Sequence, residues 1–400
     1  MLSELLRRLT DRHLRDALLA SAVSLGSKLG TVGVGFIVTV LIARRFGASG
    51  SGVWVLATTF LMIASYVSLC GLDYATTRAI AIHRSADRWS GIRGWTYAAL
   101  LILGAVGSVV SLGAWLGAPL ISRLLVGGPD FQHILGIMCL AVIPSCVLRL
   151  LGGLFRGMSR FAVAEVLEGT VVPVVLAVTA LTVGLHSLRQ VATVYSGATI
   201  VAAVIGLSAW FLMMGGRGRP ADPLHIRGAL TRSLPMAGTV LALLASPWIL
   251  TVALARYAST ADVGIFRVAM QFILLLGLLL NATDTALSPQ IAALHSARKL
   301  KELLNSTKHM TALLIVGGGI PALILTIFAG AFLSILGPEF PRGATAMRIL
   351  LIGQMVNLGT GPVGSFTVSL TLSWASATSE PRSRPRTESF TAIRRAFSSR

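Results

Sequence analysis

Lys28 is the residue of this sequence whose setting most clearly predicts chemistry. It lies inside the apolar run 18–43, and no acidic residue occurs within ten positions on either side. A charge at the centre of a bilayer costs about 2.5–3.5 kcal/mol on insertion scales, so such a lysine faces a partner or a water-filled cavity rather than lipid. The alternative, in which the side chain reaches the membrane surface, must span about 15 Å of helix. Lys28 therefore predicts a membrane protein with a cationic interior.

Three arginines near the ends of long apolar runs are further candidates for binding an anionic group. They are Arg44, Arg149 and Arg256. Arginine forms a planar fork of donors that suits an anion. The alternative for each is an orientation or anchoring charge at the membrane surface. Both interpretations stay open at this point.

A polar stripe interrupts the apolar run 265–286. Gln271, Asn281 and Asp284 fall within an arc of roughly 140° when each residue turns a helix by ~100°. Membrane helices seldom turn polar groups toward lipid, so this side is expected to line a cavity or to bond a neighbouring helix. The other acids inside predicted spans are Glu165 and Glu168.

The composition is that of a membrane protein. Apolar residues make up 54% of the chain and charged residues only 12%, which is too little charge to cover a soluble protein of 400 residues. The net charge of +19 comes from short segments between apolar runs, which favours orientation in a membrane over nucleic-acid binding. All three cysteines lie in apolar runs, so neither a disulfide framework nor a metal site is expected. No cofactor is predicted.

Ten segments approach the length of about 20 apolar residues that a membrane helix needs. They are 18–43, 53–72, 95–116, 135–154, 162–183, 191–213, 234–255, 265–286, 310–333 and 346–369. The segments between them are too short for a soluble domain. Because backbone polar groups must be satisfied inside a bilayer, the predicted fold is an all-α polytopic bundle of about ten transmembrane helices.

The basic residues alternate between the two sides of this predicted bundle. Most of them fall in segments on the side of the N-terminus, whereas the other side carries few, among them Arg123, Arg189, Arg267 and Arg342. Loops rich in lysine and arginine stay in the cytoplasm. The N-terminus and, after an even number of spans, the C-terminus are therefore predicted to be cytoplasmic.

An internal repeat divides the chain. At a constant offset of 212, the segment 42–57 matches 254–269, with Ala43-Arg44 opposite Ala255-Arg256 and Gly52 opposite Gly264. Both segments join a first apolar run to a second. The expected domains are an N-terminal six-helix lobe (1–213), a C-terminal lobe of four helices (214–369) and a disordered cytoplasmic tail rich in Ser, Arg and Pro (370–400). A repeat of six helices predicts twelve, so the last two are lacking.

Several motifs resemble one family of exporters. They are Ala43-Arg44-Arg45-Phe46-Gly47 with Gly52 after it, Gly71-Leu72-Asp73, the segment 156–161 (RGMSRF) and the segment 361–364 (GPVG), together with Lys28 in the first helix. Over roughly residues 15–370 the chain resembles the Wzx-type oligosaccharide flippases. These form the polysaccharide exporter branch of the MATE-like multidrug/oligosaccharidyl-lipid/polysaccharide exporter superfamily. The resemblance implies two lobes around a central cavity. Its expected pattern of twelve helices is broken after Leu372.

The resemblance also implies a function. Members flip undecaprenyl-diphosphate-linked oligosaccharides across the bacterial inner membrane by alternating access during cell-surface polysaccharide biosynthesis. Lys28 is then the leading ligand for the diphosphate, with Arg149 as a group that captures substrate from the cytoplasm. Asp284 either pairs with Lys28 in the empty state or carries a coupling proton or sodium ion. The expected partners are the lipid-linked oligosaccharide and the lipid bilayer.

Three alternatives remain. A cation-coupled drug antiporter of the same superfamily is expected to have acids dominating its cavity, whereas the deepest charge here is Lys28. A membrane-embedded glycosyltransferase or ligase needs a catalytic acid or histidine cluster on a sizeable loop, and no such loop or DxD or HExxH motif is present. The third alternative is an inactive remnant that lacks two helices. The prediction is a transporter and not an enzyme.

Overall fold

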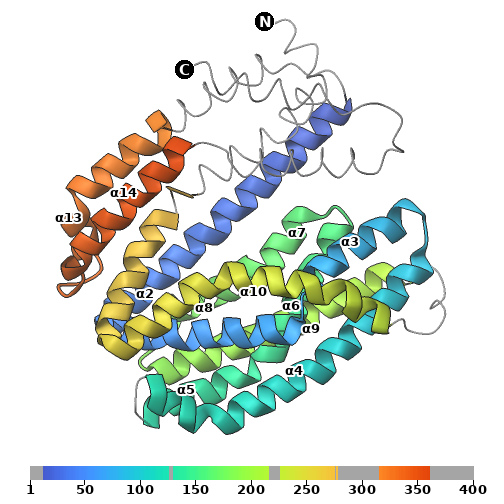
Figure 1. Cartoon of the computed structure of the whole chain (residues 1–400), viewed down its shortest axis with the longest axis horizontal. Coiled ribbons are helices and arrows are strands. Elements are labelled where there is room, and N and C mark those ends of the chain that lie inside the picture. The colour runs from blue at the N-terminus through green and yellow to red at the C-terminus, as the bar shows by residue number, and fades with distance from the viewer. Residues whose placement is uncertain (1–11, 126–128, 216–225, 275, 278–314, 361–400) are drawn as a thin grey trace, which may run out of the picture.

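The computed structural model describes residues 12–125, 129–215, 226–274, 276–277 and 315–360, and in these ranges the chain is helical and has no β-strand (Figure 1). The first helices are α2 (Arg12–Leu69), α3 (Leu72–Ser85), α4 (Trp89–Leu125), α5 (Pro129–Leu140), α6 (Val142–Gly157), α7 (Phe161–Glu165), a π-helix η1 (Val166–Thr170), α8 (Val171–Thr182), α9 (Leu188–Met214) and α10 (Ile226–Tyr257). They are followed by helices at 260–274, Ile315–Ile327, α13 (Ala329–Ser334), a 3₁₀ helix η2 (Phe340–Gly343) and α14 (Ala344–Thr360). The all-α prediction is confirmed.

Several of the described helices are long enough to span a membrane. Gly26–Leu69, Trp89–Leu125, Phe161–Thr182 and Leu188–Met214 are each long and apolar enough to cross a bilayer. Two further spans are possible as bent pairs, Asp130–Leu140 with Val142–Gly157 (43°) and Ser233–Ala242 with Pro247–Tyr257 (46°). Because Gly26–Leu69 is 44 residues long and covers two predicted spans, the first seven predicted spans all coincide with helices. The last three lie partly outside the described residues, so the total of ten stays a prediction.

The first two predicted spans are joined by a kink. Residues 44–53 stay helical within α2, and only Gly47 leaves helical geometry, with φ +68°. Glycine tolerates this left-handed φ because it has no Cβ. The backbone N–H of Ala48, which starts the second half of α2, is bound by Glu339 Oε2 at 3.0 Å. Gly47 thus divides α2 into two helices that meet at a kink, and the second helix starts at Ala48.

The segment after the second predicted span forms a helix that the hydropathy pattern did not predict. Leu69 ends α2, Cys70 and Gly71 both have positive φ, and α3 then continues to Ser85. A Cβ on Gly71 would lie 2.4 Å from the Ser233 carbonyl oxygen of α10. Gly71 therefore permits both the sharp turn and the close passage of α10 (Figure 1).

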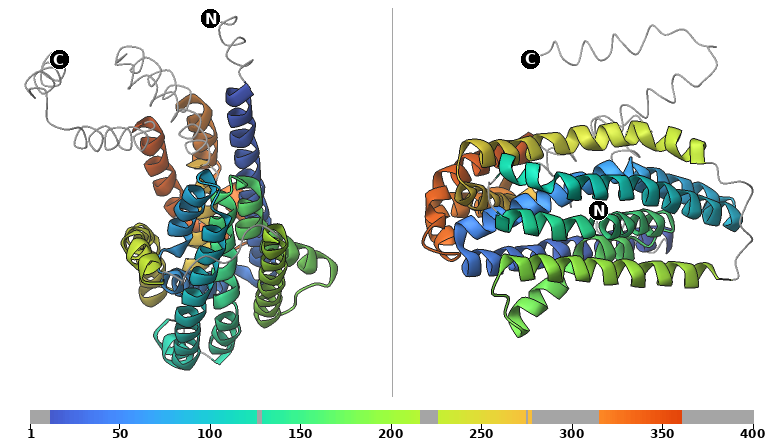
Figure 2. Two further views of the ribbon diagram at one scale, coloured as in Figure 1. Left: turned by 90° about the vertical axis from the view of Figure 1, so that its right-hand side faces the viewer. Right: turned by 90° about the horizontal axis from the view of Figure 1, so that it is seen from below.

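The core of the N-terminal bundle is built around α6. This helix packs against α2, α3, α4 and α9, and Leu150, Leu151 and Leu154 on it are at most 1% exposed. Phe155 meets Trp210 of α9 edge to face, with ring centroids 5.3 Å apart. Figure 2 shows the helices of this bundle running roughly parallel. Six consecutive apolar or glycine positions, 150–155, explain why α6 is buried on nearly all sides.

A second hydrophobic cluster forms around the 260–274 helix, α13 and α14. It includes Ile265, Phe272, Leu333 and Leu351, and it is joined by Ala48 of α2. The helix α10, by contrast, packs against α2, α3 and α4. Figure 1 shows α13 and α14 side by side at the edge of the molecule. The lobe boundary near residue 214 stays a prediction.

The two repeats meet through equivalent residues. The offset of 212 pairs Ala48 with Thr260 and Gly52 with Gly264. A Cβ on Gly52 would lie 1.7 Å from the Thr260 carbonyl oxygen, and a Cβ on Gly264 would lie 2.2 Å from the Ala48 carbonyl oxygen. Gly52 therefore packs on Thr260, four positions before Gly264, and Gly264 packs on Ala48, four positions before Gly52. This reciprocal crossing supports a two-fold relation between the repeats.

A second short motif occurs twice in the sequence. The segment 128–131 reads GPDF and the segment 337–340 reads GPEF. Phe131 and Phe340 are both buried, at 2% and 1% exposure. The acidic residues of the two motifs have different partners: Asp130 forms an ion pair with Arg189, whereas Glu339 accepts a hydrogen bond from the Ala48 backbone N–H.

Candidate functional site

Two adjacent cavities lie between the helices. The larger, of about 520 Å³, is enclosed by α2, α6, the π-helix, α8, α9, α10 and the 260–274 helix, and the smaller has a volume of about 250 Å³. They share the lining residues Thr58, Pro173, Tyr195 and Arg267. Together they form a space with several polar groups on a largely apolar wall, and its lining comes from both repeats. Small-molecule sites of transporters lie in this kind of position between repeats.

Arg149 is held on the wall of the larger cavity by aromatic residues. Its Nη1 donates to the Tyr66 hydroxyl at 2.8 Å, and its guanidinium carbon lies 4.3 Å from the centre of the Tyr66 ring. Tyr66 in turn contacts Trp248 of α10, with ring centroids 6.0 Å apart. These contacts use one face and one nitrogen of the guanidinium. The remaining donors are available to a ligand.

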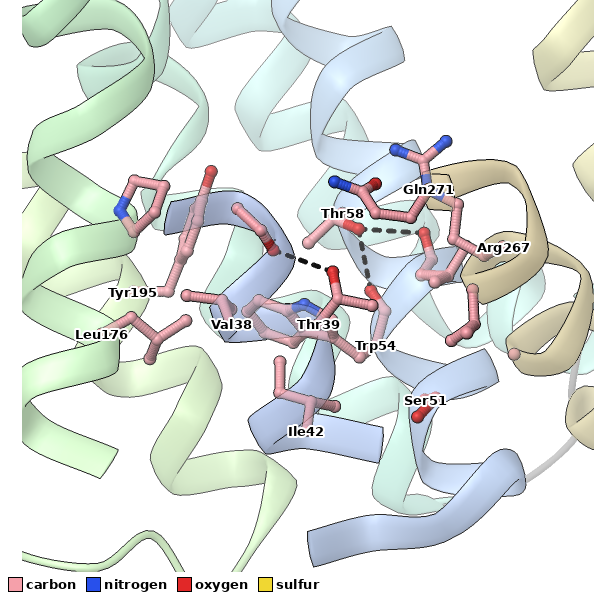
Figure 3. Close-up of a pocket in the computed structure, with 15 residues that line it drawn as sticks. Val38, Thr39, Ile42, Ser51, Trp54, Thr58, Leu176, Tyr195, Arg267 and Gln271 are labelled. Carbon is pink, nitrogen blue, oxygen red and sulfur yellow. Dashed lines mark hydrogen bonds between the residues drawn. The ribbon is translucent and has the colours of Figure 1, made fainter. Parts of the chain in front are cut away.

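Arg267 and Gln271 form the second polar group of the cavity. Both extend from the 260–274 helix, four residues apart, so they lie on one face of it. Figure 3 shows them side by side, with Thr58 of α2 nearby. Arg267 lines both cavities and Gln271 lines the smaller one. This places a second guanidinium next to an amide at the junction of the cavities.

The acid of the larger cavity, Glu168, is neutralised by an arginine. Arg156 donates to both of its carboxylate oxygens at 2.7 Å, in a bidentate pair that is partly buried. Glu168 belongs to the π-helix η1. Pro173 follows three positions after this segment; it lacks the N–H that would continue the helical ladder, which favours an irregular turn here. Across from it, the hydroxyls of Thr31 and Thr170 lie 2.7 Å apart.

The net character of the cavity is basic. In the described ranges the salt bridges are Arg156–Glu168 and Arg189–Asp130, so neither Arg149 nor Arg267 has a carboxylate partner there. The half-buried hydroxyls of Thr58 and Thr251 on the wall already donate to backbone carbonyls four residues earlier. Their oxygens can therefore accept from a ligand. The cavity thus offers two guanidinium groups for an anion and hydroxyl oxygens as acceptors for ligand hydroxyls.

Residues 19–295 match the family model described as polysaccharide biosynthesis protein. The chain belongs to this family. A curated relative of it is the probable flippase AglR of Haloferax volcanii, which is 26% identical over 353 residues, covering 85% of this chain and 68% of the relative.

Solved structures of transporters share the fold of this chain. An inward-facing multidrug resistance MATE family transporter of the MOP superfamily aligns with a TM-score of 0.62 at 15% identity, covering 88% of this chain and 86% of the other. A MOP superfamily transporter from Pyrococcus furiosus, described as having a binding pocket of reverse polarity that suggests a different function, aligns with a TM-score of 0.56 at 14% identity, covering 89% and 84%. The chain is therefore a multi-pass membrane protein with the MATE-like fold of this superfamily.

The structure brings together two of the residues that the sequence singled out. Arg149 lines the larger cavity and Gln271 the smaller. Lys28 is exposed on α2, about one turn before the lining residue Thr31, and is not among the residues that form either cavity. Its role in substrate binding stays a prediction.

The other predicted site residues lie elsewhere. Arg44 is exposed, and its Nε donates to the Ile335 carbonyl oxygen at 3.0 Å. Arg256 is exposed near the end of α10. Asn281 and Asp284 lie outside the described residues. These positions leave Arg44 and Arg256 beside the crossing of the repeats rather than in the cavities.

Arg267 is the functional candidate that sequence reasoning missed. It was grouped with the orientation charges because the predicted span began at residue 265. The helix begins at 260, so Arg267 lies about two turns inside it. The available signal was its spacing of four residues from Gln271, which puts both on one helix face.

Proposed function

We propose that this chain is a flippase that moves an undecaprenyl-diphosphate-linked oligosaccharide across the bacterial inner membrane by alternating access. The observation that carries the proposal is the pair Arg149 and Arg267 on the cavity walls, where neither has a carboxylate partner among the described residues. Membership of the polysaccharide biosynthesis family and the fold of the MOP superfamily support it. The N- and C-termini are proposed to be cytoplasmic, as the bias of basic residues predicts.

The cavity chemistry suits both parts of such a headgroup. A diphosphate is an acceptor-rich anion, and the guanidinium groups of Arg149 and Arg267 bind it through charge-assisted hydrogen bonds. The sugars present hydroxyl donors, which the hydroxyl oxygens of Thr58 and Thr251 accept because their own protons are bound to backbone carbonyls. The hydrocarbon tail remains in the lipid. The protein thus provides polar contacts in place of the hydration that a headgroup loses when it enters the bilayer.

A drug antiporter with the same fold is a weaker fit. The cavity acid, Glu168, is already paired with Arg156, so an organic cation meets unpaired guanidinium groups instead of free carboxylates. Like charges in one cavity repel and disfavour binding. This charge balance is the reason for preferring an anionic lipid-linked substrate.

Binding of farnesyl diphosphate, a soluble probe with a prenyl chain and a diphosphate, tests the proposal. Each arginine forms charge-assisted hydrogen bonds of about 1.5–3 kcal/mol, so Arg149→Ala or Arg267→Ala should weaken binding about 10- to 150-fold. The matched control is Arg123→Ala, because Arg123 is exposed at the end of α4 and lines neither cavity. Unchanged affinity in the double variant, or displacement of the probe by an organic cation such as tetraphenylphosphonium, would contradict it.

A further inference from the structure

Asp73, at the start of α3, has an environment that the proposed transport function does not use. The residue is only 7% exposed, and its Oδ1 is buried without a hydrogen-bond partner in the part of the chain that the structure describes. It sits where α3 crosses α6, because a Cβ on Gly153 would lie 2.5 Å from the Asp73 carbonyl oxygen. A buried carboxylate with an oxygen that no donor reaches is disfavoured, which favours the protonated form of the group.

Among the described side chains, the charged groups around Asp73 leave it without a counter-ion of its own. From α6, Arg156 is engaged in its bidentate pair with Glu168, and Arg149 is bound to the ring and hydroxyl of Tyr66. From α4, the Arg93 guanidinium donates to the Met214 carbonyl. The described part of α10 brings the backbone of Ser233 and Ala237 to the neighbouring Gly71.

The charges that act on Asp73 come chiefly from α6 and the π-helix. Burial raises the pKa of Asp73; the backbone N–H of Tyr74 and the charges of Arg149 and Arg156 only partly offset this effect, and Glu168 reinforces it. On α3 itself, the titratable neighbour is Tyr74.

Two carboxylates and one arginine therefore meet at α6. Gly152 and Gly153 make this possible: a Cβ on Gly152 would lie 2.0 Å from Glu168 Oε1, so the carboxylate of the π-helix reaches α6 only at a glycine. Arg156 follows three and four residues later on the same face. With Arg156 bound to Glu168, one proton on Asp73 leaves the group of three electrically neutral.

We propose that Asp73 is a proton-binding site whose occupancy is linked to anion binding in the cavity through the Arg156–Glu168 pair. Glu168 is the connecting residue, because it lines the cavity with Arg149 and also holds Arg156. An anion at Arg149 makes the potential around Glu168 and Asp73 more negative and so favours the proton on Asp73. By linkage, the proton favours the anion to the same extent. The inference rests on the proposed function for the identity of the anion, but the proton site itself does not.

Infrared difference spectroscopy of the full chain in lipid nanodiscs tests the proton directly. The wild-type protein without ligand should show a carboxylic-acid C=O band that disappears as the pH is raised. Asp73→Asn, which keeps the shape of the neutral acid, should lack this band. Glu168→Gln frees Arg156 for Asp73, so the band should vanish at a pH lower by about one unit or more. Asp262→Asn, at an exposed carboxylate, is the matched control and should retain the wild-type band.

Farnesyl diphosphate binding tests the linkage. Above the pH at which the free protein loses the proton, wild-type affinity should fall by up to tenfold per pH unit, and Asp73→Asn should remove this dependence. A band that persists in Asp73→Asn would overturn the proton site. The same pH slope in wild type and Asp73→Asn would overturn the linkage. If the probe does not bind wild type at all, the proposed function fails, while the infrared band still decides the proton site.

Discussion

The close contact at Gly52 and Gly264 predicts that a single added methyl group separates α2 from the 260–274 helix and so opens the cavity on that side of the membrane. A Cβ on Gly52 would lie 1.7 Å from the Thr260 carbonyl oxygen, whereas real contacts of a Cβ essentially never fall under 3.0 Å. In Gly52→Ala, α2 and the 260–274 helix must therefore separate by more than about 1 Å. The neighbouring atom belongs to the backbone, so no side chain can rotate away. Overpacking of this kind costs about 1–3 kcal/mol.

That energy acts on the equilibrium between closed and open states. The crossing is on the side that the distribution of basic residues predicts to be outside. If the strain is present only when this side is closed, 1–3 kcal/mol shifts the ratio of closed to open protein by about 5- to 150-fold. Gly264→Ala should act in the same direction, because its Cβ would lie 2.2 Å from the Ala48 carbonyl oxygen. Gly30→Ala on the same helix α2 is the matched control, since a Cβ there meets nothing within 4 Å.

Labelling of a single cysteine measures the opening. Thr39, which lines the smaller cavity next to the crossing, is replaced by cysteine in a chain whose native Cys70, Cys139 and Cys146 are serine. A membrane-impermeant maleimide added outside right-side-out vesicles should label it faster in Gly52→Ala and at the parental rate in Gly30→Ala. Equal labelling of the two glycine variants, with both present in the membrane at parental amounts, would refute the closed crossing.

Two further predictions concern the caps around this crossing. Glu339→Gln should increase the same labelling by less than Gly52→Ala, because an amide oxygen still accepts from Ala48 N–H but lacks the charge that favours a helix N-terminus. Asp130→Asn, in the similar motif GPDF, should not increase it, because Asp130 pairs with Arg189 instead. The Asp262 carboxylate accepts hydrogen bonds from the backbone N–H and the hydroxyl of Ser259, and these bonds lower its pKa. Its contribution to stability is therefore present above pH 3.8, the pKa of the unfolded state, and is lost as the pH falls below that value. Thermal unfolding should be followed as the pH is lowered from about 6 to about 3. The Tm of the wild type should fall more steeply with pH than the Tm of Asp262→Asn, and equal slopes would contradict the assignment.

Hydropathy, charge bias and the repeat predicted the main architecture from particular segments. The first seven predicted spans coincide with helices, and the matching glycines Gly52 and Gly264 prove to contact the equivalent residues of each other's repeat. These features follow from solvent transfer and backbone sterics, which are local properties of the sequence. The helix α3 was not predicted because its apolar residues are interrupted by polar ones, and its position depends on the turn at Gly71.

The cavity was predicted less well than the helices. Charge bias gives the side of the membrane on which a residue lies but not its depth, so Arg267 was placed with the surface charges. The partnership of Arg156 with Glu168 depends on the π-helix and on Gly152, which bring together helices whose contact leaves no periodic pattern in the sequence. Lys28 was ranked by its depth in an apolar run, whereas the structure places the charged lining of the cavity on α6, the π-helix and the 260–274 helix.

Transbilayer movement of an undecaprenyl-diphosphate-linked oligosaccharide in proteoliposomes tests the central claim most directly. The wild-type chain should move the lipid to the other leaflet, Arg149→Ala with Arg267→Ala should reduce the rate at least about tenfold, and Arg123→Ala should leave it unchanged. Movement by the double variant at the wild-type rate would contradict the assignment of these two arginines as the groups that bind the diphosphate.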